Sequence, residues 1–293
     1  MKAARLLRPA MWSYALQRLC TWYPLRRVLS SAVAAMRPSH STDKRTEAAE
    51  LAHTLYRHGI AMLPSFVSAE VIERIKVHLR GARLNERFPP CRKNFTFESV
   101  PENVHVAEYD TDYILRCPDV VALANHPSLV GAAARYLHCK PTISNISIWW
   151  SLPAGGAPQE AENYHRDVDE WRFVKFFLYM TDVDDSGGPH CFVRGSHRSS
   201  RFLWIRRIRD EEIIRVFSPN DRLKITGRTG DAFLEDTFGL HKGQPPTGRP
   251  RLLLQVEYSI NPIAVYNYST KILPPDGPVI DGYINRLYFD RAH

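Results

Sequence analysis

The stretch NYHRDVDEW, residues 163–171, places His165 and Asp167 two positions apart after a loop rich in glycine and proline. Residues i and i+2 of an extended chain point to the same side, so both side chains can reach one metal ion. A non-haem Fe(II) centre uses two neutral imidazoles and one carboxylate as its protein ligands. A single H-x-D pair is common by chance, so a metal site requires a second histidine from elsewhere in the chain.

Four histidines downstream can supply the missing ligand: His190, His197, His241 and His293. The sequence favours His241, because it follows the predicted strand GDAFLEDT and because Arg251 comes ten residues later, at the start of the most apolar strand. An arginine in that position can hold a carboxylate through two parallel hydrogen bonds. Arg249 competes for this role, since it would lie on the same side of the strand. The pattern predicts one cavity for a metal ion and an organic acid.

The elements that must position these residues change character near Thr142. Before it, apolar residues recur at helical spacing over 48–56 and 69–80, and prolines open two shorter helices at 118–124 and 127–138. After it, TISNISIWWSL alternates apolar and polar residues, and further candidate strands are WRFVKFFLYMTDV, HCFV, RLKIT, DAFLED and RLLLQVEYSI. Helices followed by at least six strands predict a mainly β fold with flanking helices and a jelly-roll, cupin-like core.

The predicted organisation is a basic leader over residues 1–42 and a single domain over residues 43–293. Within that domain we expect helical support over 43–140, the jelly-roll core over 141–260 and a tail over 261–293, with a polar loop at about 83–106. A chain of 293 residues has ample length for one large core of this kind.

The net charge of +8 is concentrated in the leader, which contains seven basic residues and no acid. The rest of the chain carries only +1, so it lacks the basic face that nucleic acids require, and we expect no nucleic-acid partner. The uncharged runs of the leader are too short to span a bilayer. Three interpretations stay open: an organelle-targeting peptide, an amphipathic segment on an anionic membrane surface, and a solvated, unstructured tail.

The five cysteines form an odd number and contain no C-x-x-C motif. This argues against a disulfide framework and against a thiolate zinc site. We therefore expect a reducing intracellular compartment, which is either the cytoplasm, with or without membrane association, or the mitochondrion.

Three segments together resemble the phytanoyl-CoA dioxygenase-like family of Fe(II)- and 2-oxoglutarate-dependent oxygenases. They are YHRDVDEW, DVDDSGGPHCFVRGSHR and GDAFLEDTFGLHKGQPPTGRPRLLLQVEYS, and the helical entry HGIAMLPSFVSAEVIERI is similar to the beginning of the family. The resemblance covers about residues 57–260. It implies a double-stranded β-helix in which His165, Asp167 and His241 bind Fe(II) and Arg251 pairs with the far carboxylate of 2-oxoglutarate, with O2 as the second cosubstrate.

The same resemblance implies a reaction that releases succinate and CO2 and hydroxylates a small-molecule or lipid-like substrate. Relatives that halogenate have a small residue where this chain has Asp167, so the carboxylate indicates hydroxylation. Two positions depart from the family. Many relatives have a hydroxyl residue two positions after the distal histidine, where this chain has Gly243, and the usual proline before Gly-Ser-His is Arg194. One hydrogen bond to the cosubstrate must then come from elsewhere.

Other residues allow two interpretations each. Trp171 is predicted to wall the cosubstrate pocket, although a buried tryptophan also serves packing. Lys175 faces either the cavity or the solvent. His197 is expected to be structural, and His190 belongs either to the core or to the pocket. The insertion over residues 197–217 could receive an anionic substrate, a carrier phosphate or a membrane surface, or be a solvated helix face; its basic residues are Arg198, Arg201, Arg206, Arg207 and Arg209.

Two alternatives to an active oxygenase follow from the same residues. One is a catalytically inactive, cupin-like protein that binds a metal or a ligand. The other is a peripheral membrane protein that uses the fold as a scaffold for its leader. Only the oxygenase would form succinate from 2-oxoglutarate in the presence of iron.

Overall fold

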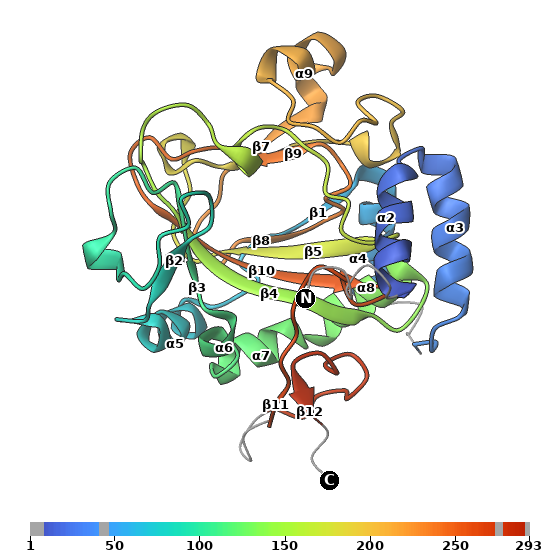
Figure 1. The fold of residues 1–293 in the computed structure, drawn as a ribbon, viewed down its shortest axis with the longest axis horizontal. Coiled ribbons are helices and arrows are strands. Elements are labelled where there is room, and N and C mark those ends of the chain that lie inside the picture. The colour runs from blue at the N-terminus through green and yellow to red at the C-terminus, as the bar shows by residue number, and fades with distance from the viewer. Residues whose placement is uncertain (1–8, 41–46, 273–277, 291–293) are drawn as a thin grey trace.

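The structure is a computed structural model that describes residues 9–40, 47–272 and 278–290. Its centre is a seven-stranded antiparallel sheet, the major sheet, with the order β1-β8-β5-β10-β4-β3-β2 (Figure 1). The strands are β1 (Ile60–Leu63), β2 (Leu84–Glu86), β3 (Val106–Tyr109), β4 (Thr142–Ser151), β5 (Phe173–Tyr179), β8 (Ala232–Glu235) and β10 (Arg251–Ser259). From β1 to β4 the neighbours in the sheet are not consecutive in sequence, which is typical of a jelly roll, whereas β4, β3 and β2 at the other edge are consecutive.

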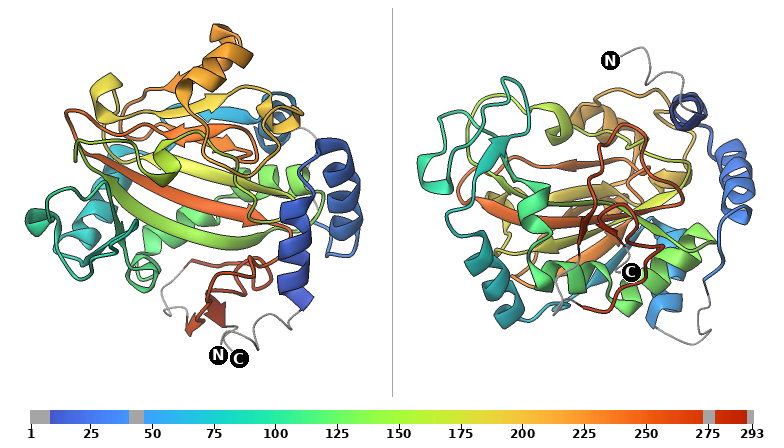
Figure 2. Two further views of the ribbon diagram at one scale, coloured as in Figure 1. Left: turned by 45° about the horizontal axis from the view of Figure 1, so that its top comes forward. Right: turned by 60° about the horizontal axis from the view of Figure 1, so that its bottom comes forward.

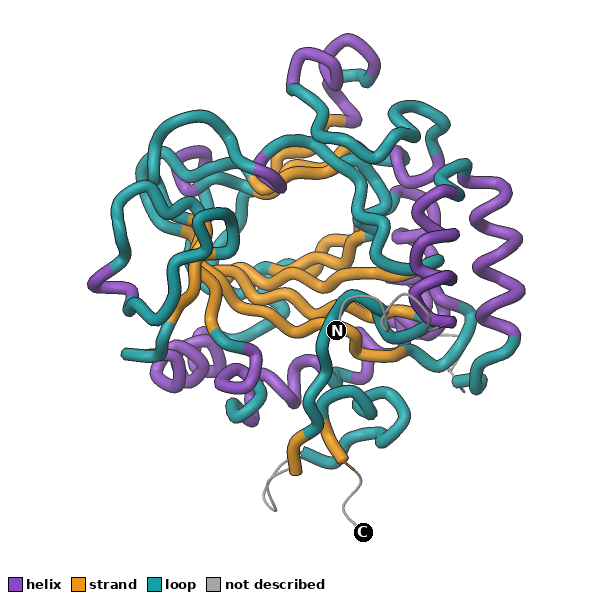
Figure 3. Tube along the Cα trace, viewed as in Figure 1, coloured by secondary structure: helices purple, strands orange, loops and turns teal. Residues whose placement is uncertain are grey.

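A second sheet, the minor sheet, faces the major sheet across the interior (Figure 3). It has three strands in the order β7-β6-β9, which are β7 (Arg222–Ile225), β6 (His190–Val193) and β9 (His241–Gly243). Phe192 on β6 packs in one buried cluster with Phe177, Phe233 and Leu253 of the major sheet. The two sheets with flanking helices confirm the predicted mainly β, jelly-roll fold.

Helices cover the outer face of the major sheet, below the sheet in Figure 1. They are α4 (Glu47–His58), α5 (Ala69–Leu79), α6 (Thr111–Ile114), α7 (Pro118–Ala124) and α8 (Pro127–Leu137). The sequence determines their ends: the Ser68 side chain accepts a hydrogen bond from the Val71 amide at 3.5 Å, and prolines occupy the first turn of α7 and α8. The predicted helices at 69–80, 118–124 and 127–138 are confirmed to within about a residue.

The alternation along β4 determines which side chains enter the interior. Ile146 and Ile148 pack against the helices in the largest apolar cluster, whereas Ser147 and Ser151 line a cavity on the opposite face. A strand with one apolar and one polar face usually exposes the polar face to solvent. Here the polar face lies inside the protein, because the space between the two sheets is a binding cavity.

The described part of the leader is folded onto the body. α2 (Pro9–Leu19) and α3 (Tyr23–Ala35) stand beside the sheets at one end of the molecule (Figure 2). The Gln17 side chain donates to the Val168 carbonyl at 2.6 Å, and the Arg37 guanidinium donates to Asn261 Oδ1 at 2.7 Å. Residues 9–40 are therefore joined to the body by side-chain contacts, and the division into a leader over residues 1–42 and a domain over residues 43–293 stays a prediction. Membrane-surface contact through the leader stays a prediction.

Arg26 anchors the leader from within. The residue is 4% exposed. Its guanidinium donates to the Gln17 carbonyl at 2.7 Å and to the Glu170 carbonyl, and it lies 4.5 Å from the centre of the Phe238 ring. Burial lowers the pKa of Arg26 to about 10, so the side chain stays charged at neutral pH. Because its donors have acceptors, this buried cation stabilises the contact between α3 and the loop that follows Asp169.

We expect the Arg26→Met substitution to lower the free energy of unfolding by about 3 kcal/mol, because buried hydrogen bonds to a charged group are lost. Urea unfolding and the rate of proteolytic removal of the leader measure the effect. Arg27→Met is the matched control, since Arg27 is exposed and should change stability by at most about 0.5 kcal/mol. Equal losses in both variants would contradict the anchoring role of Arg26.

Several elements were missing from the sequence prediction. Part of the expected loop at 83–106 forms β2, and the tail contains β11 (Lys271–Ile272) and β12 (Phe289–Asp290). The insertion carries α9 (Asp210–Val216), and short 3-10 helices are η1 (Phe97–Ser99), η2 (Glu160–Glu162), η3 (Asp185–Gly187), η4 (Ser196–Arg198) and η5 (Pro219–Asp221). Among the described residues, no helix combines the length and the apolar composition needed to cross a bilayer.

Candidate metal and cosubstrate site

Backbone pairing brings His165 and His241 together across the interior. The His165 amide donates to the His241 carbonyl at 3.0 Å, and the His241 amide donates to the His165 carbonyl at 3.1 Å. The Asp167 amide donates to the Thr237 carbonyl at 2.9 Å, which keeps the segment extended for two more residues. His165 and Asp167 therefore project to the same side, as the i, i+2 spacing predicted.

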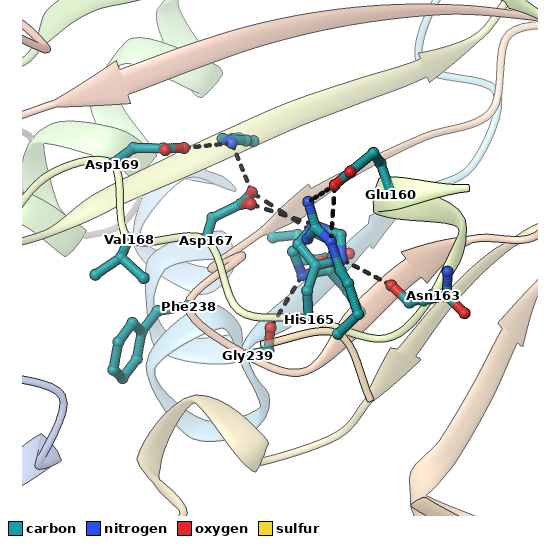
Figure 4. Close-up of polar contacts among 12 residues, drawn as sticks. Glu160, Asn163, His165, Asp167, Val168, Asp169, Phe238 and Gly239 are labelled. Atoms are coloured by element: carbon teal, nitrogen blue, oxygen red, sulfur yellow. Dashed lines mark hydrogen bonds and ion pairs between the residues drawn. The ribbon is translucent and has the colours of Figure 1, made fainter. Parts of the chain in front are cut away.

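The three side chains converge on one point. His165 Nε2 lies 3.3 Å from Asp167 Oδ1, His241 Nε2 lies 3.5 Å from Asp167 Oδ2, and one ligand atom from each residue lies within 4.8 Å of the others. The Nδ1 atoms of His165 and His241 face the carbonyls of Asn163 and Gly239 at 2.9 and 3.0 Å (Figure 4). An Nδ1–H donated to a carbonyl leaves the Nε2 lone pair directed at the centre, as metal-binding histidines require.

The electrostatics suit a dication. Burial, followed by repulsion from His241, lowers the pKa of His165, so its imidazole is neutral and able to donate a lone pair. Burial alone would raise the pKa of Asp167, but Lys175 and the two histidines hold it well below its usual range. Burial alone would lower the pKa of His241, but the carboxylates of Asp167 and Glu235 raise it, so a metal ion would bind there in competition with a proton. With that proton displaced, the three residues offer two imidazoles and one carboxylate, which is the donor set of a non-haem Fe(II) centre.

Lys175 lies inside the site and does not reach solvent. Its Nζ is 2.7 Å from Asp167 Oδ2 and 2.8 Å from Asp169 Oδ2. This contact occupies one oxygen of Asp167 and leaves Oδ1, the oxygen nearer His165, for a metal ion. Of the two interpretations of Lys175, the structure supports the inward one. The anions that it meets are the carboxylates of Asp167 and Asp169.

Arg251 lies in the same cavity, which we call the catalytic cavity and whose volume is about 550 Å³. Its side chain is buried. Within residues 9–40, 47–272 and 278–290, only Nη2 has a hydrogen-bond partner, the Ser151 hydroxyl at 3.0 Å, and Nε and Nη1 have none. A Cβ on Gly243, two residues beyond His241 on β9, would lie 3.2 Å from Arg251 Nη2. Two residues of a strand span about 7 Å, so Gly243 and the adjacent Arg251 guanidinium lie at a distance from His241 that a five-carbon dicarboxylate can bridge. Buried guanidinium donors without acceptors indicate a binding site for an anion.

Arg249 does not compete for this role. Its guanidinium is exposed and pairs with Asp184 at the surface. Arg251 is the first residue of β10 and pairs in register with Ser151 of β4, which directs its side chain inward. The structure therefore resolves the alternative between the two arginines in favour of Arg251.

Ser151 is a site residue that the sequence analysis missed. Many relatives have a hydroxyl residue at the position of Gly243, and here a hydroxyl reaches Arg251 from the neighbouring strand instead. The signal was available, because Ser151 lies on the polar face of TISNISIWWSL, but that face was not assigned to the cavity. Ser151 is thus a candidate source of the hydrogen bond that Gly243 cannot provide.

We expect Ser151→Ala to weaken 2-oxoglutarate binding about 5- to 10-fold, which corresponds to about 1 kcal/mol for one hydrogen bond. Titration of 2-oxoglutarate into metal-loaded protein measures the effect. Ser147→Ala is the matched control, because Ser147 lines the same cavity but pairs in register with Gln255 and not with Arg251. A larger loss in the control would assign the hydrogen bond to Ser147.

Trp171 does not line this cavity, so the prediction that it walls the cosubstrate pocket is wrong. Its indole Nε1 donates to Ser13 Oγ of α2 at 3.1 Å, and its ring lies in a second cavity beneath α3. The reason is the path of the loop. Asp169 still lines the catalytic cavity, but the chain then turns outward, and the Glu170 carbonyl meets Arg26 of α3.

The other predicted histidines occupy different places. His190 lines the cavity, and its Nε2 lies 2.9 Å from Glu235 Oε2, a buried carboxyl whose pKa burial raises to about 8. His197 faces the Tyr56 carbonyl at 3.2 Å and serves packing, as predicted. His293 lies outside the described residues.

The basic insertion is largely paired. Arg206 binds Glu212 at 2.5 Å, Arg207 binds Glu160 at 2.8 Å, and Arg198 donates to the Arg57 carbonyl at 2.7 Å. Side chains that are already paired at a surface offer little to an anionic partner. These contacts favour the interpretation of this segment as a solvated face.

Two imidazoles and a carboxylate at one point, beside a buried arginine and inside a jelly roll, define the class of Fe(II)- and 2-oxoglutarate-dependent oxygenases. Iron, 2-oxoglutarate and O2 are the cofactor and cosubstrates of this class. The chain belongs to the phytanoyl-CoA dioxygenase (PhyH) family, whose model matches residues 55–250. The predicted family is confirmed.

Solved structures show the same fold. The chain is similar to EctD from S. alaskensis with bound Fe, with a TM-score of 0.54 and 17% identity over 87% of this chain and 94% of that one. It is also similar to the non-heme alpha ketoglutarate dependent carbocyclase SnoK from nogalamycin biosynthesis, with a TM-score of 0.51 and 17% identity over 73% and 85% of the two chains. No curated protein matches the sequence.

Proposed function

We propose that this protein is an Fe(II)- and 2-oxoglutarate-dependent hydroxylase of a small polar molecule. The observation that carries the proposal is the convergence of His165, Asp167 and His241 in one cavity with the buried, unpaired donors of Arg251. In this proposal the first three residues hold iron, and Arg251 with Ser151 holds the far carboxylate of 2-oxoglutarate. When bound, iron and 2-oxoglutarate supply the oxidising chemistry, in which O2 is consumed and succinate and CO2 are released.

The side chains of the protein orient the reactants and exclude water. Lys175 fixes the carboxylate of Asp167, and the carbonyls of Asn163 and Gly239 fix the two imidazole rings. Positioning of this kind reduces the reorganisation that the reaction requires. A carboxylate at position 167 supports hydroxylation, because halogenating relatives have a small residue there.

The far end of the cavity supports a polar substrate. Gln255 lies four residues along β10 from Arg251, which is about 13 Å, and Asn145 of β4 lines the same cavity two residues along β4 from Ser147, the register partner of Gln255. Tyr266 and Tyr268 of the tail line the same region. These residues offer amide and hydroxyl hydrogen bonds and no long apolar channel, which favours a small polar substrate over the lipid-like alternative.

Residues of the tail line the end of the cavity at which we expect the substrate to bind. Tyr266, Tyr268 and Tyr288 all line the cavity, and all lie beyond residue 250, where the match to the family ends. Substrate selectivity is therefore built in part from residues outside the family core. This agrees with the general observation that one fold serves many substrates through its peripheral segments.

The test uses protein loaded anaerobically with Fe(II), then exposed to isotopically labelled O2 with 2-oxoglutarate and pools of small metabolites. We expect slow succinate formation without any pool, and faster formation with the right pool together with one labelled oxygen atom in the product, detected by mass spectrometry. Asp167→Asn is the matched control and should form no succinate. Binding of iron and 2-oxoglutarate without any succinate would show a catalytically inactive relative.

A further inference from the structure

A second cavity, of about 480 Å³, lies between α3, α4, α8 and the start of β5. None of the residues that line it lines the catalytic cavity. One wall comes from the leader, through Tyr23, Arg27 and Ser30, and the opposite wall comes from the body, through Arg135 and Arg172. Its volume is in the range of small-molecule binding sites.

The lining of this second cavity is strongly cationic. It contains four arginines and a single acid, and these residues are Arg26, Arg27, Arg135, Arg172 and Asp236. Asp236 already accepts hydrogen bonds from the Tyr136 hydroxyl and from the Phe238 amide at 3.0 Å. One engaged carboxylate cannot neutralise four guanidinium groups. Burial, followed by repulsion from Arg172 and Arg27, lowers the pKa of His138 at the same cavity, which agrees with this excess of positive charge.

Two of the arginines have buried donors without acceptors. Nε and Nη2 of Arg135, and Nη1 of Arg172, are buried and have no hydrogen-bond partner among the described residues. The other terminal nitrogen of Arg172 donates to Ser30 Oγ at 2.7 Å and to Ser31 Oγ at 3.1 Å, which fixes the plane of its guanidinium. Buried donors on charged groups are costly unless an acceptor satisfies them. An anion in the cavity would supply those acceptors.

The chemistry of the walls selects the kind of anion. Guanidinium groups match the oxygens of a phosphate through parallel hydrogen bonds. The remaining surface is aromatic, with Tyr23, Tyr56, Trp171, Phe173 and Phe238 among the lining residues. Aromatic side chains next to arginines suit a ligand with an apolar or ring-shaped body and one phosphate group.

We propose that this second cavity binds a small organic phosphate, with Arg27, Arg135 and Arg172 holding the phosphate and the aromatic side chains holding the rest of the molecule. The site is independent of the proposed oxygenase activity. Because its two walls belong to the leader and to the body, the ligand bridges them and stabilises the folded position of α3 by mass action. The leader is then part of a binding site as well as of the fold.

The test uses the full chain without metal, so that phosphate cannot bind iron, at constant ionic strength. Phenyl phosphate is titrated into the protein by calorimetry, and the melting temperature is followed in parallel. We expect saturable binding of phenyl phosphate with a rise in melting temperature, and binding at least 10-fold weaker in the Arg135→Met/Arg172→Met double variant. The control is Arg201→Met/Arg209→Met, which removes the same charge from the exposed insertion and should bind as the parent chain does.

Three results would overturn the proposal. They are the absence of saturable binding, equal affinity in the double variant and the parent, and binding of benzoate as tight as that of phenyl phosphate, which would assign a general carboxylate site. If the double variant does not fold, Arg27→Met replaces it, because Arg27 is exposed at the rim and its loss leaves the buried contacts intact. Unchanged affinity in Arg27→Met would then count against the proposal.

Discussion

We expect the Arg251→Met variant to bind 2-oxoglutarate more weakly than the parent chain by about 30-fold or more. Removing one partner of a buried, hydrogen-bonded charge pair costs about 2–5 kcal/mol, and each 1.4 kcal/mol corresponds to about a factor of ten in affinity. Nε and Nη1 of Arg251 have no other acceptor, so nothing else in the cavity depends on them. The dissociation constant of 2-oxoglutarate is measured by titration into protein loaded with Mn²⁺ under anaerobic conditions.

The most stringent control is Arg249→Met, which also replaces an arginine by methionine, two residues before Arg251. Arg249 is exposed and paired with Asp184, so the affinity should stay within about 2-fold of the parent. Arg251→Lys keeps the charge but loses the planar pair of donors, and should fall between the two. Equal effects at positions 249 and 251 would show that general charge, and not the buried guanidinium, attracts the cosubstrate.

Replacement of His241 by alanine should remove high-affinity metal binding and all succinate formation. The substitution deletes one of the three ligand atoms that meet at one point, and two protein ligands hold a dication poorly. Loss of a residue that only hydrogen-bonds to a metal ligand lowers metal affinity by roughly 10- to 100-fold. Because His241 is itself a ligand in this assignment, we expect the affinity for Mn²⁺ to fall by more than that. Paramagnetic resonance of Mn²⁺ titrated into the metal-free protein measures it directly.

The His190→Gln variant tests whether replacing any histidine close to the metal site lowers the affinity for Mn²⁺. The ring of His190 stacks on His241 with centroids 5.6 Å apart, and it lines the same cavity, yet it is not one of the three converging residues. We expect it to keep Mn²⁺ affinity within about 10-fold of the parent. If His190→Gln lost the metal as completely as His241→Ala, the assignment of the third ligand would have to change.

The elements of the fold were largely predictable where one local rule decided them. Ser68 defines the start of α5 through a local hydrogen bond to the helix backbone. Prolines define the starts of α7 and α8, because their φ angle is fixed at a value that suits the first turn of a helix. The strands β4 and β10 were predictable from their apolar runs. β9 was not, because its three residues are held in the sheet only by pairing with β6.

The candidate site was predictable in part. His165 and Asp167 were identified from their spacing, and His241 and Arg251 from their distance along the chain and from the family resemblance. Ser151 was missed and Trp171 was placed wrongly, since their roles depend on which face of β4 is interior and on where the loop after Asp169 turns. Neither fact is encoded by residues close to them in sequence.

The sequence by itself determined the residue types at the site, the alternation that makes the strands and the caps that end the helices, because these depend on neighbours within a few positions. The tertiary structure alone decided that the polar face of β4 points inward, that the Ser151 hydroxyl reaches Arg251, and that the leader closes a second, cationic cavity. The physical reason is that burial and pairing are properties of the assembled sheets and helices, which bring together residues a hundred or more positions apart, such as Ser151 with Arg251 and Arg26 with Glu170.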